Sequence, residues 1–200
     1  MLILVSLAGF SFLAAACSFA ETVWIDGKLP EDSYSEGEWV WDEQLTQGET
    51  VSHTSNTTSG RDRRQFRTES KVSVGSETEI IQYIYLDPAN LPSGIMAKFI
   101  YDNDDELSLY WESDREAFVD MSEYITAWYM GPLPEAGKWV RLDIKYGEFD
   151  LSDANIIDGM AFIVSDGKAW WGKTIIKKKG EEYAEEKTQG QTKVAQQESK

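Results

Sequence analysis

Aromatic residues are the side chains of this sequence that suggest a chemistry most directly. The chain of 200 residues has 8 tryptophans and 9 tyrosines, more than a core of Val, Ile and Leu requires. Exposed rings can stack on the apolar C–H faces of sugars, while neighbouring polar side chains bind hydroxyl groups. Strand alternation favours a ligand-binding face that contains Lys98, Tyr110, Trp128 and Arg141, with Trp171 as an outlying candidate.

Motifs for catalysis are missing from the sequence. The single histidine, His53, lies in a Ser/Thr-rich run, and no G-x-S-x-G motif is present. Neither a Cys/His cluster for zinc nor a Gly-rich phosphate loop occurs. A pair among the 35 acidic residues could hydrolyse a glycosidic bond, but nothing in the sequence selects one. We therefore expect that the protein is not an enzyme. A glycan-cleaving enzyme is kept as the least favoured interpretation, after the two non-catalytic ones given below.

One acidic loop could bind a hard cation. Asp102, Asp104, Asp105 and Glu106 offer alternating oxygen ligands, but the loop lacks the glycine and the distant glutamate of an EF-hand. A charged hairpin tip that keeps a sheet edge soluble is the favoured interpretation. We expect no metal site and no cofactor, while a structural calcium ion in this loop stays open.

The charge balance excludes one class of partner. Lys and Arg number 19 against 35 Asp and Glu, which gives a formal net charge of -16. A negatively charged surface repels nucleic acid and anionic membranes. We expect no nucleic-acid partner, and membrane attachment only through a lipid.

The N-terminal segment has the pattern of an export signal over residues 1–20. Its first sixteen residues, MLILVSLAGFSFLAAA, are uncharged and apolar. Two processing routes stay open: a lipobox-like stretch would lead to lipidation of Cys17, the only cysteine, whereas Ser18-Phe19-Ala20 suits ordinary cleavage after Ala20. The predicted location is the cell envelope, as an outer-membrane lipoprotein, or the extracellular space.

Short apolar and aromatic runs bounded by turn residues fill residues 21–176, whereas residues 177–200 are charged and are predicted to form a disordered tail. About ten strands at this spacing indicate an all-β fold, a two-sheet antiparallel β-sandwich or jelly roll. The predicted strands are Thr22 to Asp26, Trp39 to Trp41, Val51 to Thr54, Gln65 to Thr68, Glu79 to Leu86, Ile95 to Tyr101, Leu107 to Trp111, Thr126 to Met130, Trp139 to Tyr146, Gly159 to Ser165 and Ala169 to Lys177.

Two prolines and two glycines in GPLPEAGKW, residues 131–139, predict a turn that leads directly into a strand. In that strand Val140, Leu142 and Ile144 should face the core, while Trp139 and Arg141 should share the other face. An Asp-Gly pair at Asp166-Gly167 predicts a hairpin. In the adjacent pair Trp170-Trp171, one ring should point away from the core if both lie in a strand.

The order of these motifs resembles that of a β-sandwich module found in large secreted bacterial proteins. The resemblance covers residues 22–176 and depends most on LDPANLP (86–92) and MGPLPEAGKWVRL (130–142). More loosely, the chain is similar to galactose-binding-like, jelly-roll carbohydrate-binding modules. That resemblance implies a non-catalytic exported module that binds carbohydrate or a cell-surface polymer. A structural or protein-interaction lipoprotein of the cell envelope, with a protein partner, is the alternative.

Overall fold

The computed structural model describes residues 19–113, 117–118, 127–149 and 155–179. Cys17, most of the predicted signal segment and residues 180–200 of the predicted tail lie outside the described residues. The chain divides into one unit of Glu21–Lys178 and a second unit that combines Met1–Ala20 with Lys179–Lys200. The β-sandwich is formed by the first unit.

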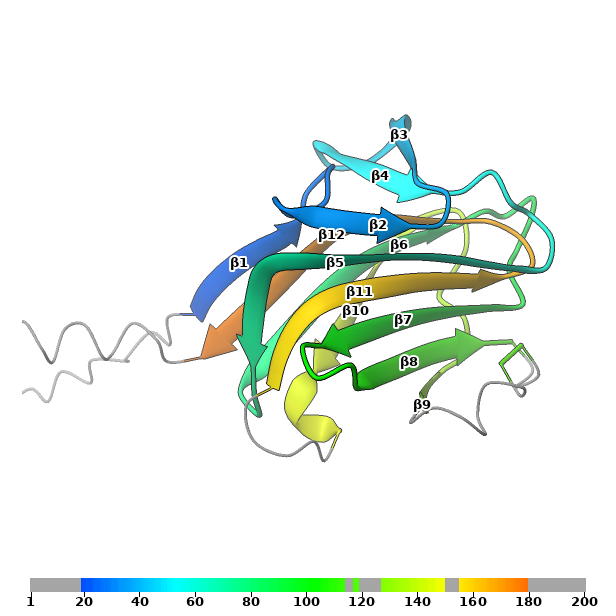
Figure 1. The fold of residues 1–200 in the computed structure, drawn as a ribbon. Helices are drawn as coiled ribbons and strands as arrows, with labels where there is room; N and C mark the ends of the chain where they lie inside the picture. The colour runs from blue at the N-terminus through cyan, green and yellow to red at the C-terminus, as the bar shows by residue number, and fades with distance from the viewer. Residues whose placement is uncertain (1–18, 114–116, 119–126, 150–154, 180–200) are drawn as a thin grey trace, which may run out of the picture. The chain divides into compact units, whose positions relative to one another are not determined.

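The described residues contain twelve strands and one short 3₁₀ helix. Figure 1 shows their arrangement. Their bounds are β1 Phe19–Ile25, β2 Ser33–Glu36, β3 Val40–Gln47, β4 Thr50–Thr54, β5 Arg61–Val74, β6 Thr78–Leu86, β7 Gly94–Tyr101, β8 Glu106–Glu112, β9 Ala127–Gly131, β10 Trp139–Lys145, η2 Tyr146–Glu148, β11 Asn155–Ser165 and β12 Ala169–Lys179.

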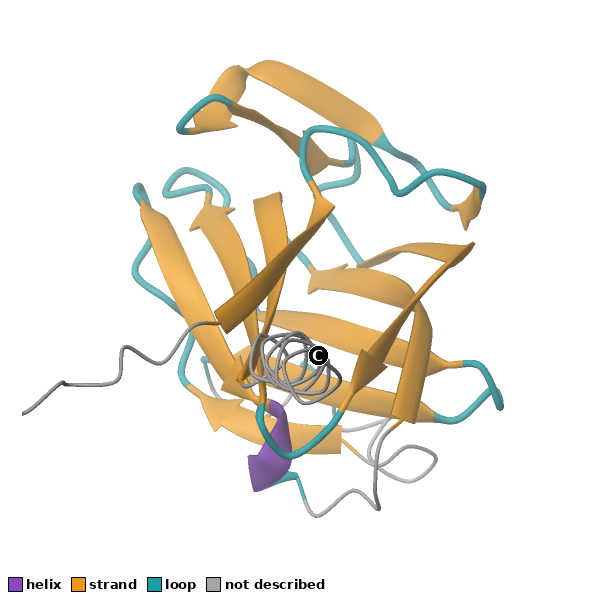
Figure 2. Cartoon of the chain, turned by 90° about the vertical axis from the view of Figure 1, so that its left-hand side faces the viewer, coloured by secondary structure: helices purple, strands orange, loops and turns teal. Residues whose placement is uncertain are grey.

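The strands form two sheets of six. Sheet A has the order β10-β6-β12-β4-β3, with β1 also paired to β12, and sheet B has the order β2-β5-β11-β7-β8-β9. The sheet B strands β5, β11, β7 and β8 lie side by side in Figure 1, and Figure 2 shows the two sheets from the side. The all-β two-sheet sandwich predicted from the sequence is confirmed. One pair, β8 with β9, is parallel rather than antiparallel. None of the described segments forms a helix long and apolar enough to cross a membrane.

The core lies between the sheets because alternate residues of each strand point to one side. Sheet A contributes Ile80, Ile84 and Ile144, and sheet B contributes Phe99 and Phe162, all fully buried in one hydrophobic cluster. Leu142 is also buried in this cluster, and Val140 packs against it. The predicted inward set of β10 is therefore confirmed.

Strand β2 was not predicted, and several strands extend beyond their predicted bounds, among them β3, β5 and β11. Strand β5 runs from Arg61 to Val74, far beyond the predicted Gln65 to Thr68, because its polar residues alternate with inward ones such as Phe66. Strand β12 continues to Lys179, two residues beyond its predicted end at Lys177. Lys177 and Lys178 pair with Glu79 and Thr78 of β6, which extends the ladder into the charged segment.

The Asp-Gly turn does not make a hairpin. Strand β11 belongs to sheet B and β12 to sheet A, so this turn carries the chain from one sheet to the other. Both Asp166 and Gly167 adopt positive φ, as the sequence pattern requires. Neighbouring loops bind the turn: Asp166 donates its backbone N–H to Gly60 O, and Gly167 donates to Thr58 O. These long-range bonds override the local hairpin signal.

Candidate functional site

Three aromatic side chains form a row across the outer side of sheet A. Trp139 of β10 lies opposite Tyr85 of β6, and Tyr85 lies opposite Trp170 of β12. Ring centroids are 5.9 Å apart for Tyr85 and Trp139 and 5.7 Å apart for Tyr85 and Trp170. All three rings are partly exposed, as is Tyr83 on the same side of β6. We call these four residues the aromatic face.

Strand alternation explains why these rings lie outside the core. Ile84 and Trp171 fill the interior with 0% exposure, so their chain neighbours Tyr85 and Trp170 must point to the opposite side. The same period places Trp139 outside, because Val140 packs against the core. The row is therefore a consequence of two-residue periodicity in three hydrogen-bonded strands.

Gly172 makes room for the indole of Trp139. A Cβ atom at position 172 would stand 3.2 Å from Cζ3 of Trp139 and 3.3 Å from Cβ of Tyr83. Because β6 separates β10 from β12, the indole must extend across β6 to reach this glycine. The Trp139 ring is inclined by 60° to that of Tyr85, and the Tyr85 ring by 83° to that of Trp170.

Polar groups border the aromatic face. Trp170 donates its Nε1–H to Asp42 Oδ2 at 2.8 Å, and Lys168 Nζ lies 4.9 Å from the centroid of the Trp170 ring. Burial alone would raise the pKa of Asp42, but hydrogen bonds from the Gln44 backbone and Trp170 outweigh it and lower the pKa. Asp42 is therefore an ionised acceptor at neutral pH.

Arg141 lies on the same side, opposite Tyr83 in the register of β10 and β6. Its guanidinium donates to Asp143 Oδ1 at 2.6 Å, and this hydrogen bond raises the pKa of Arg141. The face thus combines exposed ring surface with an acceptor at one end and N–H donors at the other.

The structure does not bring the five predicted site residues together. Lys98 and Tyr110 share the outer side of sheet B, where Lys98 faces Ser108 and Tyr110 faces Met96. Lys98 is only 2% exposed and forms an ion pair with Glu106. Tyr110 packs at 5.8 Å from the ring of Phe118 in a small second cluster. Only Arg141 among the five lies on the same side of sheet A as the aromatic face, beside Tyr83.

Trp128 and Trp171 occupy other positions. Trp128 lies opposite Leu109, a core residue, and its ring is 5.5 Å from that of buried Phe149, so Trp128 and Tyr110 are on opposite sides of sheet B. Trp128 remains 38% exposed. The predicted exposure of Trp171 is corrected: it is fully buried, because β12 directs it inward onto Phe162 and turns Trp170 outward.

The acidic loop between β7 and β8 has its carboxylates bound to protein groups. Asp104 forms an ion pair with Arg67, and Glu106 forms one with Lys98. Asp105 accepts from the side chain of Asn103 at 2.7 Å. Within the described ranges, no group of three or more His, Cys, Asp or Glu residues is arranged to hold a metal ion.

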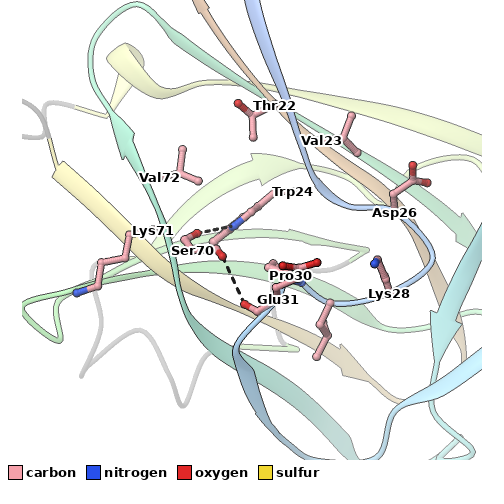
Figure 3. A pocket seen from close by; sticks show the side chains of 11 residues that line it. Thr22, Val23, Trp24, Asp26, Lys28, Pro30, Glu31, Ser70, Lys71 and Val72 are labelled. Atoms are coloured by element: carbon pink, nitrogen blue, oxygen red, sulfur yellow. Dashed lines mark hydrogen bonds between the residues drawn. The ribbon is translucent and has the colours of Figure 1, made fainter.

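A pocket of about 430 Å³ opens between β1 and β5, on a different part of the molecule (Figure 3). Trp24, 5% exposed, lies beside it and donates its Nε1–H to Ser70 O at 3.2 Å. The lining mixes acidic Asp26 and Glu31 with basic Lys28 and Lys71. It presents no partly exposed aromatic ring and contains none of the residues predicted as a site.

Sequence reasoning missed Tyr83, Tyr85 and Trp170 as a group. Their signal was present in the alternation of YIYL in β6, where Ile84 and Leu86 are buried, and in AWWG of β12, where Trp170 alone is not buried. The partners of these strands were the missing information, since β10, β6 and β12 come from distant parts of the chain.

Comparison with known proteins finds likeness only at the level of structure. Neither the protein-family profiles nor the curated protein sequences contain a match. The glycoside hydrolase domain of Endo-D from Streptococcus pneumoniae R6 is 16% identical with a TM-score of 0.44, over 72% of this chain and 21% of that one. The chain thus spans about a fifth of that structure.

Two carbohydrate-binding modules are also similar. The family 11 module from Clostridium thermocellum, in complex with a β-1,3-1,4-mixed-linked tetrasaccharide, is 11% identical with a TM-score of 0.33, over 84% of this chain and 89% of that one. A module specific for non-crystalline cellulose is 13% identical with a TM-score of 0.36, over 78% and 90% of the two chains.

Proposed function

We propose that this chain is a non-catalytic module that binds carbohydrate through the aromatic face of sheet A. The observation that carries the proposal is the row of Trp139, Tyr85 and Trp170, three partly exposed rings on three adjacent strands. Soluble domains bury most large aromatic side chains, and aromatic rings gathered on an outer face are typical of interaction sites, which supports a ligand there.

The chemistry of the face suits a sugar. A pyranose presents apolar C–H groups on its faces and hydroxyl groups around its edge. The indole of Trp139 supplies the stacking surface, Asp42 an acceptor, and Arg141 N–H donors. The same face does not favour a polyanion, because Asp143 pairs with Arg141 and Asp42 is an ionised carboxylate.

The proposed place of action is outside the cytoplasm, at the cell envelope or in the extracellular space. This part of the proposal is supported by the apolar segment of residues 1–20. Attachment to a membrane would require lipidation of Cys17.

Binding of the purified protein to a panel of soluble glucans, xylans, mannans and galactans tests the function, with calorimetry as the measurement. Trp139→Ala should weaken binding to any recognised glycan at least tenfold, about 1.4 kcal/mol. Trp128→Ala is the matched control, because it removes another partly exposed indole from a different site. It should retain the affinity of the wild type.

A larger loss of affinity in Trp128→Ala than in Trp139→Ala would place the binding site at β9 instead. A wild-type protein that binds no glycan of the panel would contradict the proposal. Release of reducing ends from the same glycans by the wild type would favour the enzyme instead.

A further inference from the structure

Three side chains inside the sandwich carry polar atoms that have no hydrogen-bond partner among the described residues. Arg64 of β5 is 0% exposed, and its Nε, Nη1 and Nη2 atoms are all unpartnered. The two ring nitrogens of His53 and Nε1 of Trp171 are also buried and without a hydrogen-bond partner. Buried polar groups without partners are costly and rare, so a cluster of them indicates an occupant.

These three residues surround the same ring. Arg64 faces Phe162 in the register of β5 and β11. The ring of Phe162 lies 4.7 Å from that of His53 and 5.0 Å from that of Trp171. His53 and Trp171 are themselves paired across β4 and β12. The unpartnered atoms of both sheets therefore converge on one region of the interior.

The charges of Asp62 and Glu38 both act on Arg64, but the N–H groups of its guanidinium lack hydrogen-bond acceptors. Asp62 Oδ2 lies 3.6 Å from Arg64 Nε, which is too far for a hydrogen bond, and no acceptor within the described residues reaches Nη1 or Nη2. Burial lowers the pKa of Arg64 to about 10, so the group is still a cation at neutral pH.

His53 is neutral at the same pH. Burial lowers its pKa well below 6.5, and the charge of Arg64 lowers it further. A neutral imidazole has one N–H donor and one acceptor. The region thus holds all the N–H groups of a guanidinium, an indole N–H and an imidazole N–H, against two acceptors, the imidazole nitrogen and Asp62 Oδ2.

We propose that Arg64, Trp171 and His53 form an internal site for one small monovalent anion, of halide or formate size. An anion brings acceptor capacity alone, which this excess of donors requires, whereas each water would add two more hydrogens that need acceptors. The three side chains are 0% exposed, so a ligand there would be fully enclosed, which favours a small ion over a group as large as a sugar ring. The site is separate from the aromatic face and independent of the proposed function.

Thermal unfolding of the full chain tests the site, with sodium chloride compared with sodium gluconate at equal ionic strength. A ligand that binds only the folded state should raise Tm by about 3 to 6 °C for each tenfold increase in chloride above its Kd. The same Tm in both salts overturns the proposal.

Variants separate this site from general salt effects. Arg64→Met should abolish the chloride dependence, whereas Arg63→Met, which removes an exposed arginine from the other side of β5, should keep it. An equal chloride dependence in Arg64→Met and Arg63→Met overturns the site. If Arg64→Met does not fold, Trp171→Phe removes one donor while keeping a ring, and a dependence unchanged from the wild type overturns the role of Trp171.

Crystals grown in sodium bromide give a direct test. Anomalous scattering should place a bromide ion within hydrogen-bond distance of Arg64 Nη1 or Nη2. Ordered water molecules in that position, without an anomalous peak, overturn the proposal.

Discussion

Trp139 rests against Gly172, a residue two strands away in sheet A, with 3.2 Å between its Cζ3 atom and the place where a Cβ atom of residue 172 would stand. The glycine thereby sets the position of the indole. Because the contact lies on the outer side of the sheet, it can be changed without opening the core.

Gly172→Val should displace the indole of Trp139 and weaken glycan binding about tenfold. The new side chain would overlap Trp139 and would also meet Cβ of Gln47, 3.0 Å from a Cβ atom at position 172. Calorimetry measures the affinity, and near-ultraviolet circular dichroism reports the indole environment. Gly75→Ala is the control, because no atom lies within 4 Å of an added Cβ there. Wild-type affinity in Gly172→Val would show that the position of Trp139 does not matter for binding.

Trp170 and Trp171 should differ strongly in their effect on stability. Trp171→Ala removes a fully buried ring and should cost about 3 to 5 kcal/mol of unfolding free energy. Trp170→Ala removes a partly exposed ring and should cost clearly less, while reducing glycan binding. Urea unfolding followed by circular dichroism measures both. Equal costs would contradict the assignment of the two rings to opposite sides of β12.

Stability should fall as pH drops below about 6.5, the pKa of histidine in an unfolded chain. His53 is the only histidine, and burial followed by the charge of Arg64 lowers its pKa in the folded protein. Between these two pKa values the unfolded state binds a proton that the folded state does not. The unfolding free energy therefore falls by up to about 1.4 kcal/mol per pH unit, and this contribution is constant above pH 6.5 or so.

Urea unfolding at constant chloride, from roughly pH 5 to pH 8, measures this dependence. His53→Gln should show no such slope between about pH 5 and pH 6.5, because no other side chain in the sequence has an ordinary pKa in that interval. The same slope in the wild type and in His53→Gln would contradict a neutral buried His53.

Removal of calcium should leave the stability unchanged. Arg67 and Lys98 hold Asp104 and Glu106 in ion pairs, so these carboxylates are already neutralised by protein groups. Thermal unfolding in EDTA and in millimolar calcium chloride should give the same Tm. A calcium-dependent rise in Tm would show that the loop of residues 102–106 binds the ion, and Asp104→Asn should then abolish that rise.

The sequence alone determined the fold class and, within individual strands, which residues face the core. Period-two patterns with turn residues between them specify an all-β chain, and in β10 they correctly separate Leu142 and Ile144 from Trp139 and Arg141. Local alternation suffices for this, because adjacent residues of a strand must point to opposite sides.

Tertiary structure decided which strands are neighbours and which of two similar faces is buried. Alternation could not choose between Trp170 and Trp171, since both are apolar enough for the core. The pairing of β12 with β4 and β6 settles it by placing Trp171 beside His53 and Ile84. Arg64 would be expected at the surface from its charge, yet the register with Phe162 places it inside. Such outcomes depend on contacts between distant segments, and only the folded chain brings those segments together.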